Sequence, residues 1–332
     1  MKDVAAHANV SVSTVSYVLN GTGPVSADRR ARILNAVREL NYIPNEPARS
    51  LKRQSASTIG LVIPDLSNQF FSLLAQGVSR AAAARDVLVV LCSSETSEEV
   101  ESSNSRLLRS QRVDGVVYLT GFHESPGSLL ELQSLGPVVL VDERVPGADF
   151  PAVVADGRRG ARDVATHVVE LGHKRIACIA GPTALWTAEQ RLAGYREALA
   201  MGGLDPDGME IYIGDYGMKS GYDLAAKALH TAGKRRPTAL LCANDMMAIG
   251  AMEYCRGAGL RVPADLSIVG FDDVPMAPLL TPRLTTVRQP AQAMGKSAAE
   301  LLIDLIRGDR EPTVPPPHPV AVKVRESAAP PS

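Results

Sequence analysis

From residue 58 onward, short apolar runs alternate with stretches of helical periodicity, and this alternation limits the fold more than any other feature of the chain. The first apolar run, 59–63, precedes a helical pattern over 70–85, and a second series of such units begins near residue 176. Strands that alternate with helices are typical of parallel sheets covered on both faces. About ten such units are too many for one sheet. We therefore predict an α/β fold with two doubly wound parallel-sheet lobes. The chain is expected to cross from one lobe to the other at 153–156 and at 272–289.

The composition is that of an ordinary soluble protein. At 332 residues the chain is long enough for two or three domains, and 45% of its residues are hydrophobic against 21% charged. No apolar run reaches the roughly 18 residues of a membrane helix, and the first ten residues hold no apolar secretory segment. The four cysteines are far apart and are expected to be reduced and buried. These features favour a cytoplasmic protein without a membrane partner or a bound metal.

Basic charge is concentrated in the first 57 residues. This segment contains eight Lys or Arg against four Asp or Glu, so its net charge is +4, whereas the remainder carries 27 basic and 32 acidic residues. A basic end on an acidic remainder favours a nucleic-acid partner for that end. The alternative is an ordinary solvated surface.

Three short helices are predicted in this basic segment: one over residues 2–8, one over 12–19 after the N-cap Ser11, and one after a further N-cap at Ser26. A tight turn at Asn9 between the first two helices is typical of a helix-turn-helix. Small hydroxyl groups on a helix approach phosphates and base edges without steric hindrance. The alternative is a three-helix module that binds protein. The outward side chains of the second helix are Ser13, Thr14, Ser16 and Tyr17.

Residues 3–21 resemble the DNA-binding headpiece of the LacI/GalR family of transcription regulators. Two positions depart from the family pattern, which usually has Gly where Asn9 stands and Arg where Tyr17 stands. A tyrosine cannot make the bidentate guanine contact of an arginine, so a different base preference is expected there. By the resemblance, Val12, Ser13 and Tyr17 face bases, and Thr14, Ser16 and Asn20 face the DNA backbone.

Residues 45–57 read as a short helix followed by a polar linker. Such a helix is too short to be stable alone, so it is a candidate for an element that orders only with a partner. The run 48–52 resembles the family hinge, in which two helices of a dimer pair in the minor groove. The resemblance implies that Leu51 wedges into a base step, beside Arg49 and Lys52. The alternative is that Leu51 packs on the headpiece.

Polar side chains follow several of the predicted strands directly. Ligands of open α/β sheets bind beyond the carboxyl ends of the strands, and carboxylates and amides there suit sugar hydroxyls. Phe71 and Trp186, the only tryptophan, are candidates for stacking on a sugar or base face. The alternative for any one carboxylate is a helix N-cap, and this is expected of Asp245. The strand-end side chains are Asp65, Asp142, Asn244, Asp245, Asp272 and Asp273.

The region from Thr58 to about Ser327 is similar to the effector-binding domain of the same family, which is built like periplasmic sugar-binding proteins. Purine-responsive members have an Arg where Leu185 stands, so a saccharide is the expected effector. The motifs that carry the resemblance are Phe70–Phe71, Gln190–Tyr195, Asn244–Asp245 and Gly270–Asp273. By the resemblance the effector contacts are Phe71, Arg191 and Asp272, with Thr187, Tyr216 and Asp142 as further contacts.

These observations predict a headpiece over 1–44, a hinge over 45–57 and a two-lobed effector-binding and dimerisation domain over 58–332. The expected protein is a transcriptional repressor that binds a near-palindromic operator DNA as a homodimer under the control of a saccharide. No leucine heptads follow the Pro-rich end of the chain, so a tetramer is not expected. A transport receptor and an enzyme are the alternatives. The six histidines show no triad or metal spacing, and no dinucleotide or Walker motif is present, so neither catalysis nor a cofactor is expected.

Overall fold

The chain divides into two compact units, Met1–Ser55 and Ala56–Ser332, which are described separately. The predicted hinge, with Arg49, Leu51 and Lys52, lies outside the residues that the structure describes. The computed structural model describes residues 1–20, 23–40, 42, 58–94, 98–119, 133–134, 136–145, 147, 149–230, 236–308 and 313–332.

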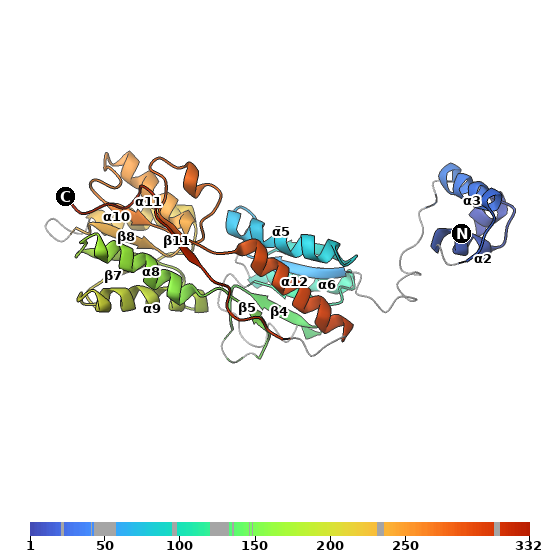
Figure 1. Ribbon diagram of the computed structural model, residues 1–332, viewed down its shortest axis with the longest axis horizontal. Helices are drawn as coiled ribbons and strands as arrows, with labels where there is room; N and C mark the ends of the chain where they lie inside the picture. Colours follow the sequence, from blue (N-terminus) through green and yellow to red (C-terminus); the bar gives the residue numbers. More distant parts are fainter. Residues whose placement is uncertain are drawn as a thin grey trace. The chain divides into compact units, whose positions relative to one another are not determined.

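In the N-terminal unit, the described helices pack around a small apolar core (Figure 1). Ser11 caps the second helix as predicted, because its Oγ accepts a hydrogen bond of 3.2 Å from Thr14 N. Asn9 adopts a left-handed conformation with φ of 54° in the turn between the first two helices, and asparagine tolerates this region better than most residues. The helices are α1 (Lys2–His7), α2 (Val12–Asn20) and α3 (Ala27–Glu39). The buried residues that hold them together are Val4, Ala5, Ala8, Val15, Val18, Ile33 and Ala36.

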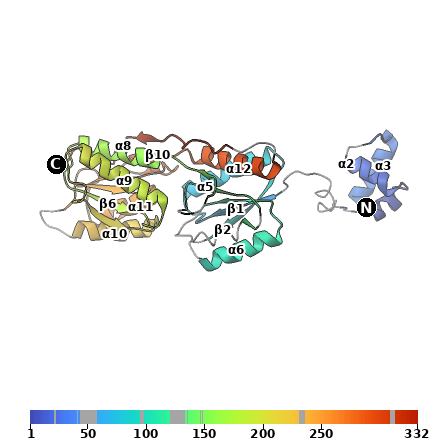
Figure 2. The same ribbon diagram turned by 90° about the horizontal axis from the view of Figure 1, so that it is seen from below.

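The first lobe of the larger unit is a parallel sheet with the strand order β2-β1-β3-β4-β5. Helices α5 and α12 cover one face of this sheet and α6 covers the other (Figure 2). α5 and α12 touch through glycines, since a Cβ at Gly77 would lie 2.1 Å from Gln292 O. The strands are β1 (Thr58–Ile63), β2 (Leu88–Ser93), β3 (Val116–Tyr118), β4 (Val138–Val141) and β5 (Ala152–Val153). The helices are α5 (Gln69–Ala83), α6 (Glu98–Ser110) and α12 (Ala291–Arg307).

The second lobe is a parallel sheet with the strand order β7-β6-β8-β9. Alternate residues of β6 belong to two different cores: Cys178 packs with α8 and α9, and Ile179 packs with α10 and α11. β7 is an edge strand without a continuous apolar run, which is why the alternation does not predict it. The strands are β6 (Ile176–Ala180), β7 (Glu210–Ile213), β8 (Ala239–Cys242) and β9 (Ser267–Val269). The helices are α8 (Gly157–Glu170), α9 (Trp186–Met201), α10 (Met218–His230) and α11 (Asp245–Gly257).

The chain passes between the lobes at the two predicted places and at one more. It crosses after β5 and again between β10 (Thr286–Arg288) and α12. The third crossing leads from α12 to β11 (Ala321–Lys323), which pairs antiparallel with β10. The predicted fold of two parallel-sheet lobes is therefore confirmed, and several passages of the chain connect the lobes. Among the described residues, no helix has both the length and the apolar character that crossing a membrane requires.

Candidate functional site

A cavity of about 350 Å³ lies where the carboxyl ends of the strands of both lobes meet. Its volume falls at the lower end of the range of small-molecule sites. Its lining residues lie at strand ends, in loops and near the beginnings of helices, and they come from both lobes. Of the residues predicted to contact an effector, the structure places Asp65, Phe71, Asp142, Thr187, Arg191, Tyr216, Asn244 and Asp272 around this cavity.

Arg191 supplies the positive charge of the cavity wall. It lies on α9, and only 4% of its surface is exposed. Its Nη1 donates to Ala243 O over 2.6 Å, and its guanidinium lies over the ring of Phe271 with 4.2 Å between Cζ and the ring centroid. Its Nε is buried without a hydrogen-bond partner among the described residues. The packing therefore holds a cation in one orientation and leaves one of its donors unused.

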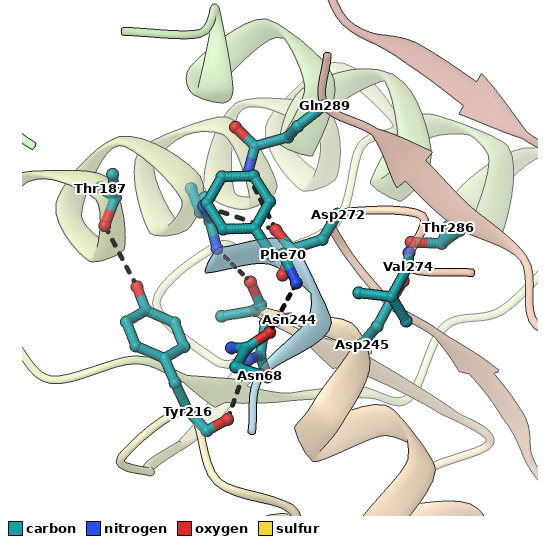
Figure 3. A network of polar contacts seen from close by, with 12 residues as sticks. Asn68, Phe70, Thr187, Tyr216, Asn244, Asp245, Asp272, Val274, Thr286 and Gln289 are labelled. Atoms are coloured by element: carbon teal, nitrogen blue, oxygen red, sulfur yellow. Dashed lines mark hydrogen bonds and ion pairs between the residues drawn. The ribbon is translucent and has the colours of Figure 1, made fainter. Parts of the chain in front are cut away.

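Asp272 faces Arg191 from the loop after β9. Its Oδ1 lies 3.9 Å from Arg191 Nη2 and accepts a hydrogen bond of 2.8 Å from Gln289 Nε2 (Figure 3). Burial raises the pKa of this carboxyl to about 7, although Arg191 and Gln289 act in the opposite direction. Its φ of 117° is a rare backbone conformation for a residue with a side chain, and such strain is found most often at functional sites.

Asp142 ends β4 in the first lobe and has a positive φ of 66°. Only 6% of its surface is exposed, and its carboxylate accepts no hydrogen bond from any described residue. Burial raises its pKa, opposed by the charge of Arg191. Because Asp142 lines the cavity, its carboxylate is placed to accept a hydrogen bond from a bound molecule.

Glu143 was not among the predicted site residues, although it lines the cavity and is only 3% exposed. Its Oε2 accepts a hydrogen bond of 3.1 Å from Thr187 N, and its Oε1 accepts one from the Thr187 hydroxyl. Burial raises its pKa to about 8, and the neighbouring charge of Asp142 raises it further. The signal available in the sequence was its position directly after Asp142 at a strand end.

Asn244 lines the cavity and also takes the N-cap role that was expected of Asp245. Asn244, not Asp245, caps α11, since its Oδ1 accepts a hydrogen bond of 2.9 Å from Met247 N. The Asn244 amide also donates to Tyr216 O over 2.9 Å. Asp245 is fully buried and accepts from Val274 N and the hydroxyl of Thr286 (Figure 3). The expectation of an N-cap at Asp245 was wrong because α11 already begins at Asp245, so the N-cap position falls on Asn244.

Trp186 is not among the residues that line the cavity, contrary to the expectation that it stacks on the ligand. Its half-buried ring packs against the core of the first lobe and lies 5.6 Å from Arg144 Cζ. Asp65 does line the cavity, but its carboxylate already accepts from Ser67 N and Ser67 Oγ, at 2.7 and 2.6 Å. Two of the predicted aromatic side chains do line the cavity: Phe71 from α5 and Tyr216. Tyr216 has a positive φ of 67°.

The face of α2 in the N-terminal unit presents the side chains that were predicted to contact DNA. Val12 is 43% exposed and Tyr17 is 49% exposed. The ring of Tyr17 lies against the backbone of Gly23, where a Cβ would be 2.9 Å from Tyr17 Cγ. Ser13 is exposed, Thr14 and Ser16 are half-buried, and the side chain of Asn20 lies outside the described part.

A helix-turn-helix unit that is joined in one chain to a two-lobed α/β unit with a polar interlobe cavity defines a ligand-responsive DNA-binding regulator. Comparison with known proteins agrees with this class. The family of bacterial regulatory proteins named the lacI family matches residues 1–45, and the periplasmic binding protein-like domain matches residues 165–328. The chain belongs to the LacI family, and it is a DNA-binding transcription regulator.

Particular relatives extend the similarity over almost the whole chain. The ribose operon repressor of Escherichia coli (strain K12) is 37% identical over 308 residues, which cover 92% of either chain. A structure of the lac repressor dimer bound to operator and the anti-inducer ONPF is 30% identical with a TM-score of 0.83 and covers 98% of each chain. A complex of the transcriptional regulator CelR with cellobiose is 32% identical with a TM-score of 0.74, again over 98% of each chain.

Proposed function

We propose that this protein is a transcriptional repressor that binds a near-palindromic operator as a homodimer and is controlled by a small saccharide, acting in the cytoplasm. The observation that carries the proposal is the interlobe cavity, which the carboxylate of Asp142 lines from the first lobe and the fixed guanidinium of Arg191 lines from the second. A polyol supplies hydroxyl donors for the carboxylates and hydroxyl acceptors for the guanidinium.

A saccharide fits the remaining features of the cavity wall. Phe71 and Tyr216 offer apolar faces on which the C–H side of a sugar ring can pack. A volume of about 350 Å³ favours a monosaccharide over a longer chain. The ribose operon repressor and the CelR–cellobiose complex, both similar to this chain, are named for sugars, which supports the same ligand class.

We place the DNA-binding headpiece at 1–44 and the hinge at 45–57, ahead of the effector domain at 58–332. Two headpieces of a dimer read the two halves of an operator whose symmetry matches that of the protein. Val12, Ser13 and Tyr17 of α2 are proposed to reach base edges. Leu51 is proposed to wedge into the central base step, with Arg49 and Lys52 on the flanking phosphates.

The saccharide controls DNA binding by favouring one arrangement of the lobes. A ligand shifts this equilibrium only by its difference in affinity for the two arrangements, typically about 1–3 kcal/mol between coupled sites. Arg191 and Asp142 line the cavity from different lobes. A sugar that touches both therefore binds the two arrangements of the lobes with different affinity.

Two measurements test the proposal. The purified protein selects bound sequences from random duplex DNA at a stated salt concentration, and a near-palindrome is expected. The selected duplex is then titrated with protein in the presence of D-ribose, other pentoses and hexoses, and cellobiose. One sugar is expected to change the DNA affinity by about 5- to 150-fold. Recovery of no common sequence would overturn the DNA-binding part, and an unchanged affinity with every sugar would overturn the effector class.

A further inference from the structure

The end of β4 in the first lobe meets the beginning of α9 in the second lobe. Residues 142–144 follow β4, and residues 185–187 begin α9. The two segments are distant in the sequence and belong to different sheets, so every contact between them is a contact between the lobes.

The first turn of α9 receives its cap from the opposite lobe. Leu185 stands at the N-cap position and makes no side-chain hydrogen bond to the helix, because leucine has no acceptor. The Glu143 carboxylate does this instead: Oε2 accepts from Thr187 N at 3.1 Å, and Oε1 accepts from the Thr187 hydroxyl.

We propose that Glu143 is a positioning residue that latches the two lobes together by capping α9 across the cleft. Separation of the lobes breaks both of its bonds to Thr187 and exposes the orphan amide of the helix. The latch therefore stabilises the arrangement in which Arg191 and Asp142 face each other across the cavity. Its influence on DNA affinity rests on the proposed function, whereas its influence on the lobes does not.

Trp186, next to Thr187, forms the second half of this interlobe contact. Its indole is supplied by α9 but packs against the apolar core of the first lobe. The guanidinium of Arg144, next to Glu143, lies 5.6 Å from the centre of the indole ring, within the distance of a cation–π interaction. The two lobes are thus joined by neighbouring residues on both sides, Glu143 with Thr187 and Arg144 with Trp186.

The groups around Glu143 make the latch sensitive to protonation. Asp142 precedes it on the same segment, Thr187 and Arg191 face it from α9, and Tyr216 contacts the Thr187 hydroxyl at 3.3 Å. Burial and the charge of Asp142 raise the pKa of Glu143 to about 8, while Thr187 and Arg191 lower it. A bound molecule that pairs with Asp142 changes this balance and thereby acts on the latch.

Trp186 is the only tryptophan of the chain, so its fluorescence reports on this interface in the full-length protein without a label. Quenching by acrylamide and the emission maximum are measured for the wild type, Glu143→Leu and Thr187→Val, without DNA or sugar. Leucine removes both acceptors that face Thr187, and valine removes the hydroxyl. Both variants are expected to increase the quenching constant and to shift the emission to longer wavelengths.

Two further variants control for a general loss of structure. Thr187→Ser keeps the hydroxyl and is expected to restore wild-type quenching. Glu197→Gln changes another carboxylate of α9, which pairs with Arg158 inside the second lobe, and is expected to leave the quenching constant unchanged. If Glu143→Leu does not fold, the comparison of Thr187→Val with Thr187→Ser decides whether the latch exists.

Wild-type quenching and emission in folded Glu143→Leu and Thr187→Val would overturn the latch, and so would equal changes in Glu197→Gln. Because neither DNA nor a sugar enters this measurement, a failure of the proposed function leaves its outcome readable. Conversely, a failed latch leaves the operator and sugar titrations unaffected.

Discussion

The guanidinium Cζ of Arg191 lies 4.2 Å from the centroid of the Phe271 ring, and its Nη2 lies 3.9 Å from Asp272 Oδ1. This planar cation is held by the stacked ring and by the hydrogen bond that its Nη1 donates to Ala243 O. An arginine in such a position presents fixed donors to a ligand, which a lysine cannot imitate.

Arg191→Lys is therefore expected to weaken binding of the saccharide effector by tenfold or more, roughly the loss of one charge-assisted hydrogen bond. Calorimetric titration with the sugar that controls the wild type measures the change. Affinity for the operator without sugar serves as the control and is expected to stay within a few-fold of the wild type. Undiminished sugar binding would show that Arg191 has a structural role alone.

Asp142→Asn is expected to raise the melting temperature of the sugar-free protein while it reduces sugar affinity. Burial raises the pKa of the wild-type carboxyl, so a neutral amide of the same size removes a desolvation cost. Asparagine also tolerates the φ of 66° at this position. A gain of about 1 kcal/mol is the expected order, as for other binding sites that sacrifice stability for function. A lower melting temperature, measured by calorimetry, would contradict the account.

Stability is expected to fall as the pH rises from about 5 to 8, in part because of Glu143. Its pKa in the folded protein is about 8, above the ordinary value of 4.5, so the folded state keeps a proton that the unfolded state has released. The free energy of unfolding therefore decreases with pH throughout this interval and levels off above it. Asp272, with a pKa of about 7, contributes with the same sign up to that pH.

The Glu143→Gln variant isolates one part of this pH dependence. Its melting temperature is expected to fall less steeply than that of the wild type between pH 5 and 8, because glutamine does not titrate. Differential scanning calorimetry at one-unit pH steps measures both slopes. Parallel curves for the two proteins would show that Glu143 does not carry the proton.

Tyr17→Arg is expected to change the preferred base sequence and to leave sugar affinity unaltered. Tyr17 is 49% exposed on α2, and an arginine there adds a bidentate donor for guanine, with a discrimination of about 1–3 kcal/mol against other bases. Selection from random duplexes with both proteins measures the change. The same consensus from both would place Tyr17 away from the base edges, where its contact with Gly23 would be its main role.

The parts of the fold that were predictable depend on local periodicity. Apolar runs such as β1 and β6 are buried along their whole length, so their sequence shows the strand directly. The edge strand β7 shows no such run because its side chains are exposed or half-buried. Strand-end carboxylates were predictable as a group for a similar reason, since parallel strands bring their carboxyl ends to one edge.

Individual roles within the site were not predictable, because they depend on partners from other elements. Asn244 and Asp245 are adjacent and both polar, yet one caps α11 and the other is buried against Thr286. Trp186 directly precedes the cavity residue Thr187, but its indole packs against the core of the first lobe and near Arg144.

The sequence by itself determined the class of protein, the helix-turn-helix, the two parallel-sheet lobes and the edge at which the polar residues gather. Periodicity, capping residues and the short motifs that carry the family resemblance are local properties, and they can be read along the chain. Only the tertiary structure decided that Glu143 caps a helix of the other lobe and that Asp142 is left without a donor. Those properties arise from desolvation and from contacts between lobes, which no single stretch of sequence contains.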